Sequence, residues 1–129
     1  MDNVDALEKI CQKIVKLDPK MRSARFINSR GHLLAGGMKK GLMSLEAQKQ
    51  DEMMFMELAL RVRMRHEFDR EFGIVHFSMS YRDKVIVMSY PLPQDEVLLV
   101  SSEKDLDFGK IAFKVLKIIE PLKSKMSTF

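Results

Sequence analysis

The residues of this chain that could do chemistry are few, and their spacing argues against each common kind of site. Residues 66–69, His-Glu-Phe-Asp, open a zinc-protease pattern, but position 70, where the second histidine should stand, is arginine. Residues 36–41, Gly-Gly-Met-Lys-Lys-Gly, lack the spacing and the terminal Lys-Ser/Thr of a phosphate-binding P-loop. His32 and His76 fall on predicted strands without a cysteine or acidic partner at ligand spacing. We therefore predict no catalytic residue, no metal site and no cofactor.

The lone cysteine and the composition indicate what class of protein this chain belongs to. Cys11 cannot form an internal disulfide, and it lies on an apolar helix stripe where we expect it to pack rather than react. The chain has 129 residues, 46% hydrophobic and 31% charged, which is typical of one globular domain. It lacks the basic start of a signal peptide and any apolar run near the ~20 residues of a membrane span. We therefore expect a cytoplasmic protein without a membrane segment.

The charge balance argues against nucleic-acid binding. The formal net charge is +4, which is a mild excess for a chain of this length. Proteins dedicated to nucleic acids usually gather Lys and Arg on one face, whereas here these residues are spread over every predicted element. The chain also has 11 methionines, whose flexible side chains suit adaptable contact surfaces.

Hydrophobic periodicity predicts the element order α-β-β-α-β-β-β-α in one domain, residues 1–122, followed by a flexible tail, 123–129. Ser44 is the expected N-cap of the middle helix. Prolines should keep the loop 91–95 out of the sheet, and Pro121 should end the last helix. The predicted helices are 3–17, 44–70 and 106–120, and the predicted strands are 22–28, 32–37, 74–81, 84–90 and 96–102.

These elements predict an α+β fold, a single five-stranded antiparallel sheet with helices on both faces. The first and last helices each have a single apolar stripe, as expected of helices that lie together on one side of a sheet. The strands 84–90 and 96–102 contain successive apolar residues, so both faces of the sheet should be buried. The middle helix then takes the other side.

The middle helix is apolar on two opposite sides. At 100° per residue, Met53, Met56, Leu60 and Met64 form one stripe, and a second stripe lies opposite. A helix with two apolar sides must be covered twice: the sheet covers one side, and a second copy of the chain covers the other. The sequence does not decide which stripe meets the sheet. We assign to the homodimer interface the second stripe and three residues of the following strand: Met54, Phe55, Leu58, Ala59, Val62, His76, Ser78 and Ser80.

Charges along this helix favour an antiparallel pairing of the two copies. Acidic residues precede the basic Arg61, Arg63 and Arg65, so the acidic half of one helix would face the basic half of the other. Glu57 and Arg61 also have the spacing of an ion pair within one helix.

Two segments carry a resemblance to a known family. Residues 24–35, Ala-Arg-Phe-Ile-Asn-Ser-Arg-Gly-His-Leu-Leu-Ala, look like the opening hairpin of the roadblock family, dynein light-chain-like relatives of the longin and profilin-like folds. Residues 98–102, Leu-Leu-Val-Ser-Ser, lead through 107–111, Asp-Phe-Gly-Lys-Ile, into the final helix in the same way. The element order resembles that family over nearly the whole chain, and the chain is most similar to its small archaeal members of unassigned function.

The resemblance implies a homodimer in which the middle helices, here 44–70, pack together and the third strands, here 74–81, join edge to edge. It also implies a scaffold or a regulator of a small Ras-like GTPase, with no catalytic residues of its own. No partner-binding motif of the family maps onto this chain residue by residue. The GTPase role therefore comes from the likeness of fold alone.

The alternative is a small-molecule sensor domain built on a PAS- or profilin-like sheet. In that case the methionine-rich positions would line an apolar cavity inside one protomer instead of an interface. Against this alternative, the sequence shows no polar residues converging where a ligand would be oriented.

Overall fold

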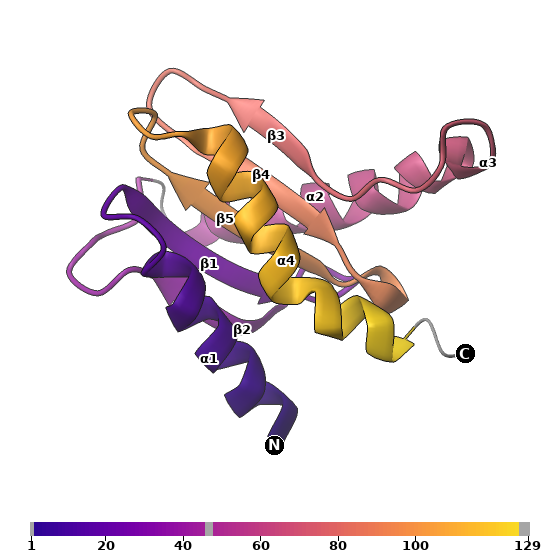
Figure 1. The fold of residues 1–129 in the computed structure, drawn as a ribbon, viewed down its shortest axis with the longest axis horizontal. Helices are drawn as coiled ribbons and strands as arrows, with labels where there is room; N and C mark the ends of the chain where they lie inside the picture. Colours follow the sequence, from indigo (N-terminus) through magenta and orange to yellow (C-terminus); the bar gives the residue numbers. More distant parts are fainter. Residues whose placement is uncertain (1, 46–47, 127–129) are drawn as a thin grey trace.

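Five antiparallel strands form one sheet, and helices cover both of its faces (Figure 1). The structure is a computed structural model that describes residues 2–45 and 48–126, with side chains for 4–45 and 48–123. The element order and the fold class are as predicted, apart from short additional helical turns. The helices are α1 Asp2–Val15, α2 Gln48–Arg65, η1 His66–Phe68, α3 Asp69–Phe72, η2 Pro93–Asp95 and α4 Phe108–Met126; the strands are β1 Met21–Ile27, β2 Leu33–Met38, β3 Ser78–Tyr81, β4 Ile86–Pro91 and β5 Val97–Ser102.

The strands lie in the order β2-β1-β5-β4-β3, so β5 is central and β2 and β3 form the edges. On one face, α1 and α4 cover the larger core, as their single apolar stripes predict (Figure 1). Cys11 and Ile14 of α1 are buried there beside Phe26 of β1. The buried Tyr90 hydroxyl of β4 donates a hydrogen bond to the Ala112 carbonyl at 2.9 Å, which ties α4 to the sheet. Packing and this buried hydrogen bond together fix α4.

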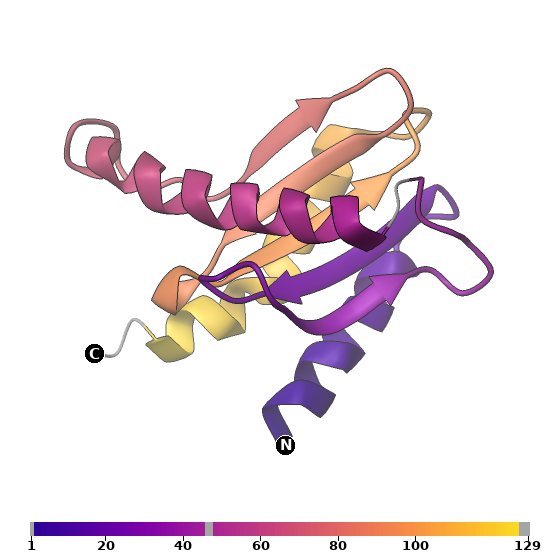
Figure 2. The same ribbon diagram turned by 180° about the vertical axis from the view of Figure 1, so that it is seen from behind.

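Helix α2 lies by itself on the opposite face (Figure 2). Its buried side chains, including Phe55 and Val62, pack against Ile27, Val97 and Leu99 of the sheet. The turn between β1 and β2 also approaches this helix closely at Gly31, whose φ is positive, +82°. A Cβ at Gly31 would lie 2.7 Å from the Met56 Cα, so only glycine permits this approach.

Several predicted boundaries are corrected by the structure. Helix α2 is described from Gln48, and the predicted Ser44 cap would involve residues 46 and 47, which lie outside the described part of the chain. The Ser44 hydroxyl accepts a hydrogen bond from Arg25 at 3.1 Å. Pro91 is the last residue of β4, opposite Val97, and not part of an excluded loop. A proline is tolerated there because the strand ends with it.

The last helix does not end at Pro121. Helix α4 continues through this proline to Met126, so the predicted tail is helical over 123–126, and residues 127–129 lie outside the described part of the chain. Proline removes one backbone hydrogen bond from a helix interior. Ile119 and Leu122, on either side of it, pack against the core, and this packing offsets the loss.

The third and fourth strands are shorter than predicted. The ladder between β3 and β4 begins at Ser78, and residues 74–77 run up to it without strand pairing. At the other end, the Arg82 amide donates to the Val85 carbonyl at 3.0 Å, which makes the turn longer than the two residues expected. Strand β4 therefore starts at Ile86.

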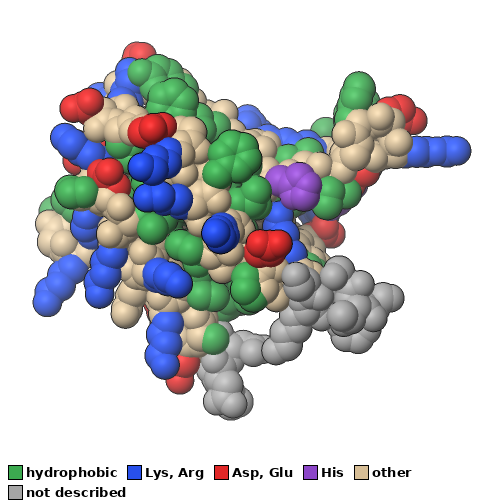
Figure 3. All heavy atoms as spheres, in the orientation of Figure 1, with side chains coloured by type: hydrophobic (Ala, Val, Ile, Leu, Met, Phe, Trp, Pro, Cys, Tyr) green, Lys and Arg blue, Asp and Glu red, His purple; other side chains and the backbone are tan. Residues whose placement is uncertain are grey.

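On the face over α1 and α4, basic side chains are mixed with acidic and apolar ones (Figure 3). Among the side chains that the structure describes, this face therefore carries no large patch of a single charge sign. This mixture agrees with the spread of Lys and Arg along the sequence. Within residues 2–45 and 48–126, none of the helices is both long enough and apolar enough to cross a bilayer.

Candidate interaction surface on helix α2

The side of α2 that faces away from the sheet carries four large apolar side chains in one line. Met53, Met56, Leu60 and Met64 are 65%, 60%, 50% and 60% exposed. We call these four residues the open stripe. Single exposed apolar residues are ordinary on a protein surface, whereas a contiguous row of them usually marks a contact site.

The structure corrects the predicted interface. Phe55, Leu58, Ala59 and Val62 are buried, and Phe55, Leu58 and Val62 pack with Ile27, Val97 and Leu99 of the protein's own sheet. Met54 packs against the same cluster and is half-buried. The sheet therefore covers the stripe that we assigned to a second copy, and the open stripe is the one left without a cover in this chain. Periodicity identified both stripes but did not show which of them meets the sheet.

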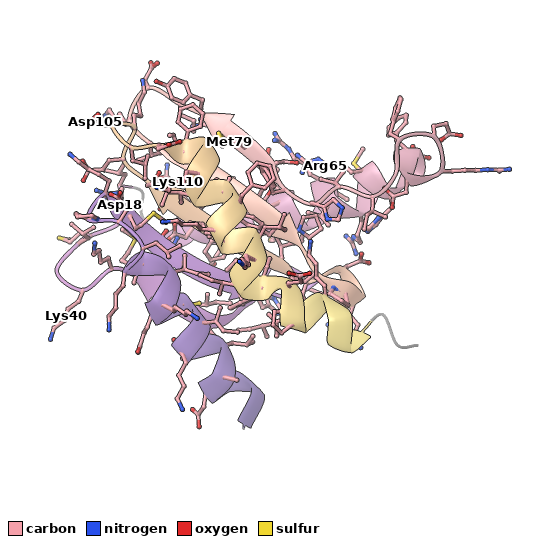
Figure 4. All side chains as sticks on the ribbon, viewed as in Figure 1. Asp18, Lys40, Arg65, Met79, Asp105 and Lys110 are labelled. Carbon is pink, nitrogen blue, oxygen red and sulfur yellow. The ribbon has the colours of Figure 1, made fainter. Side chains whose placement is uncertain are left out.

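The three predicted strand residues do not lie together. Ser78 accepts a hydrogen bond from Arg65 of α2 at 2.9 Å, where the helix passes the β3 edge (Figure 4). Ser80 lies farther along β3. His76 lies instead against α4, with its Nδ1 atom 3.5 Å from the Lys123 Nζ. The alternation stops before Ser78 because residues 74–77 have no strand partner to hold their orientation.

Beyond α2, the chain projects past the sheet through η1 and α3 (Figures 1 and 2). This projecting end is apolar, since Phe68, Phe72 and Ile74 are 56%, 83% and 63% exposed. Gly73 ends α3 with φ +82°, as a glycine after a helix is expected to do. The projecting end is therefore a second exposed apolar region, which follows the open stripe along the chain.

His66 fastens the end of α2 to the loop between β4 and β5. Its Nδ1 lies 2.8 Å from an Asp69 carboxylate oxygen, and its Nε2 lies 3.1 Å from one of Asp95. The hydrogen bond to Asp69, and then that to Asp95, raise the pKa of His66. Asp95 and Gln94 both have positive φ, +58° and +64°, in the left-handed region that costs about 1–2 kcal/mol for such residues. His66 thus holds a strained turn in place.

The contacts of His66 join η1 to α3 and to η2. Both of its ring nitrogens are engaged by carboxylates. Among the residues that the structure describes, no group of three or more His, Cys, Asp or Glu side chains is arranged to hold a metal ion.

Cys11 is buried in the larger core, as expected from its helix stripe. Burial, and to a smaller extent the neighbouring Glu8, raise the pKa of its thiol to about 12. A thiol with this pKa carries almost no thiolate at neutral pH, so it has little nucleophilic character.

Some charged side chains of α2 form ion pairs within the chain. Arg61 pairs with Glu57 at 3.4 Å, as the spacing predicts. Asp51 pairs with the buried Arg25 at 3.7 Å and is itself mostly buried. Glu52 and Arg63 are exposed and flank the open stripe.

A second feature of α2, a cavity beside it, was missed by sequence reasoning. The cavity has a volume of about 780 Å³, and its lining comes from α2, all five strands and the β3–β4 turn. Residues from so many elements cannot be grouped from their spacing in the sequence. The only available signal was the set of serines, Ser23, Ser80 and Ser101, on predicted strands.

Solved structures share this fold. The Roadblock/LC7 domain from Streptomyces avermitilis is similar, with a TM-score of 0.65 and 14% identity over 88% of this chain and 94% of that one. The gliding protein MglB from Thermus thermophilus has a TM-score of 0.73 and 8% identity, covering 95% and 91%. A structure named "MglB with tetrameric arrangement" has a TM-score of 0.73 and 9% identity, covering 95% and 90%. At these identities the likeness establishes the fold, which is the roadblock fold expected from the sequence.

Sequence comparison places the chain in a family without assigning it a role. No curated protein matches it. A family model matches residues 2–129, nearly the whole chain. The chain therefore belongs to DUF6659, a family of unknown function.

Proposed function

We propose that this protein is a non-catalytic homodimeric interaction module of the cytoplasm, a scaffold or regulator that acts on a small Ras-like GTPase. The observation that carries the proposal is the open stripe, a line of four exposed apolar side chains on a helix whose opposite side already lies on the sheet. Leaving this surface in water costs free energy, and a second copy of the same stripe removes it from water on both protomers.

An antiparallel arrangement fits the residues around the open stripe. In a two-fold symmetric pair, Met53 of one copy lies near Met64 of the other, and Met56 and Leu60 meet close to the axis. Glu52 and Arg63 flank the same side of the stripe, so each Glu52 lies near the Arg63 of the other copy. Methionine adapts its shape to such a surface. The β3 edges, including Ser78 and Ser80, then come together as the roadblock resemblance implies.

Two likenesses support self-association and a regulatory role. One of the MglB structures of this fold is named for a tetrameric arrangement. The roadblock resemblance supplies the GTPase as the class of partner, and this part of the proposal rests on that resemblance alone.

The homodimer is tested by sedimentation equilibrium at micromolar concentration. We expect a mass twice that of the 15.0 kDa chain. Met56→Glu with Leu60→Glu should give a monomer, because the charges would have to be buried without partners. The matched control is Leu33→Glu on the β2 edge, since Leu33 and Leu60 are 51% and 50% exposed. A wild-type monomer, or a dimer unchanged by the double substitution, contradicts the proposed interface.

The GTPase role has a separate test. The wild-type chain, the Met56→Glu/Leu60→Glu variant and the Leu33→Glu variant are each used for affinity capture from the native cytoplasm, followed by mass spectrometry. We expect a small GTPase to co-purify, and the purified pair to bind differently in its GDP and GTP forms. If the captured partners include no GTPase, the regulatory role fails while the homodimer stands on its own data.

A further inference from the structure

The cavity between α2 and the uncovered part of the sheet is built as a binding site, and we propose that it takes a small phosphate monoester that carries hydroxyl groups, such as a sugar phosphate. This inference goes beyond the proposed function and does not rest on it. Helix α2 crosses the sheet obliquely and leaves the β3–β4 hairpin uncovered (Figure 2). The resulting volume of about 780 Å³ lies within the ~300–1,000 Å³ of small-molecule sites.

The floor of the cavity is a row of side chains that runs across four strands. Ser23 of β1 is in register with Ser101 of β5. Ser101 is in register with Val87 of β4, and Val87 with Ser80 of β3. Residues in register project from the same face, so three hydroxyls and one valine stand in one line. The row runs from the buried Ser23 through the half-buried Ser101 and Val87 to the exposed Ser80, so it opens to solvent toward the β3–β4 hairpin.

The hydroxyl row can recognise the hydroxyl groups of a ligand. The Ser23 and Ser101 hydroxyls form a hydrogen bond with each other, which fixes their orientation. Ser23 is buried, at 1% exposed, so its hydroxyl serves to orient that of Ser101. The half-buried Ser101 hydroxyl has one donor and two acceptor positions and retains capacity for a further partner. The walls beside this row are apolar, formed by Met54 and Leu58 of α2 and by Leu99 of β5. A ligand body with both hydroxyl and carbon surface matches this lining.

The charges around the cavity select an anion. Five basic side chains line it against two acidic ones, Glu57 and Asp83, an excess of three positive charges. Asp51, outside the cavity, neutralises one of them by pairing with Arg25 at 3.7 Å. An excess of two remains, and a phosphate monoester carries close to two negative charges at pH 7. The basic side chains are Arg22, Arg25, Arg61, Arg82 and Lys84.

Geometry favours phosphate over a single carboxylate. Arginine presents a planar fork of donors that bonds phosphate oxygens in pairs. Arg61 reaches the cavity from α2, and Arg82 reaches it from the β3–β4 turn. Both are exposed, so they can move to close on a ligand without disturbing the core. Their two positions, on different elements around the opening, suit the several oxygens of one phosphate group.

The first experiment measures thermal unfolding of the full chain with defined probes. Ribose 5-phosphate, glucose 6-phosphate and AMP are each compared with ribose, glucose, adenosine and inorganic phosphate at equal ionic strength. We expect at least one phosphate monoester to raise Tm by several degrees at about 100 times its Kd. The unphosphorylated partner and inorganic phosphate should each give a smaller shift. Isothermal titration calorimetry then gives the Kd.

The second experiment locates the site with matched variants. Arg61→Gln with Arg82→Gln removes two charges from the cavity lining. Arg30→Gln with Arg70→Gln removes two charges from positions outside it, in the β1–β2 turn and on α3. We expect the first pair to weaken binding roughly tenfold or more, since both substitutions remove charged hydrogen-bond donors to the phosphate. The second pair should change Kd by less than about twofold because salt screens distant charges.

Three results overturn the inference: no monoester raises Tm, inorganic phosphate alone raises it as much as the best monoester, or both variant pairs weaken binding equally. The Tm of each variant without ligand shows that it folds.

Discussion

The Arg25 guanidinium on β1 lies 3.7 Å from the Asp51 carboxylate in the first turn of α2, and both side chains are largely buried, at 8% and 15% exposed. Arg25 also donates to the Ser44 hydroxyl and lies over the Phe55 ring, 5.4 Å from its centroid. This one guanidinium therefore joins the sheet, the segment before α2 and the helix itself.

Removing one partner of this pair should destabilise the fold. Asp51→Ala or Arg25→Ala leaves an opposite charge buried without its partner, which typically costs about 3–5 kcal/mol. The double variant Arg25→Met/Asp51→Leu should cost clearly less than the sum of the two single changes, because no charge is then left behind. Urea unfolding measures the free energy of each variant. Additive losses would show that the two side chains act independently.

The His66 contacts should make stability depend on pH. The pKa of His66 is higher in the folded protein than its ordinary 6.5, so protonation favours the folded state. Its contribution is fully present below that value and is lost as the pH rises through the raised pKa. The difference in Tm between wild type and His66→Gln should therefore be larger at about pH 5.5 than at about pH 8.5. His32→Gln, at a histidine in another loop, serves as the control.

A direct titration checks the same claim. The His66 ring protons followed by NMR should give a pKa above 6.5, and Asp69→Asn should lower it because the hydrogen bond to Asp69 is the largest cause of the shift. A titration at or below 6.5 in the wild type contradicts the role given to this residue.

Gly31 should be the more sensitive of two glycines with the same φ. Gly31 and Gly73 both have φ +82°, but a Cβ at Gly31 would lie 2.7 Å from the Met56 backbone, whereas a Cβ at Gly73 has nothing within 4 Å. Gly73→Ala should cost about 1–2 kcal/mol from its conformation alone. Gly31→Ala should cost about 2 kcal/mol more, from overpacking against α2. Equal losses in urea unfolding would mean that the turn moves away from the helix freely.

The sequence predicted those features that depend on periodicity along one element. Single stripes placed α1 and α4 on one side of the sheet, and the double stripe identified α2 as a helix with two apolar sides. The angle between two stripes does not say which of them meets the sheet, since both are apolar. That choice depends on partners such as Val97 and Leu99, whose packing against Phe55 is a property of the folded chain.

Features that depend on tertiary context were not predicted. Pro121 looked like a helix end, but neighbours packed in the core carry α4 past it. Nothing in the spacing of Asp51 along its helix indicates a partner, and only the fold brings Arg25 beside it. The cavity was missed for the same reason, because register across the strands, and not spacing along the chain, aligns its serines.

Helix α2 is occupied around almost its whole circumference. One side lies on the sheet, a second lines the cavity through Arg61 and Glu57, and a third carries the open stripe. A narrow border at Glu52 and Arg63 lies outside all three of these sides. A substitution on one of the three sides of α2 therefore alters the contacts of that side and leaves those of the other two in place.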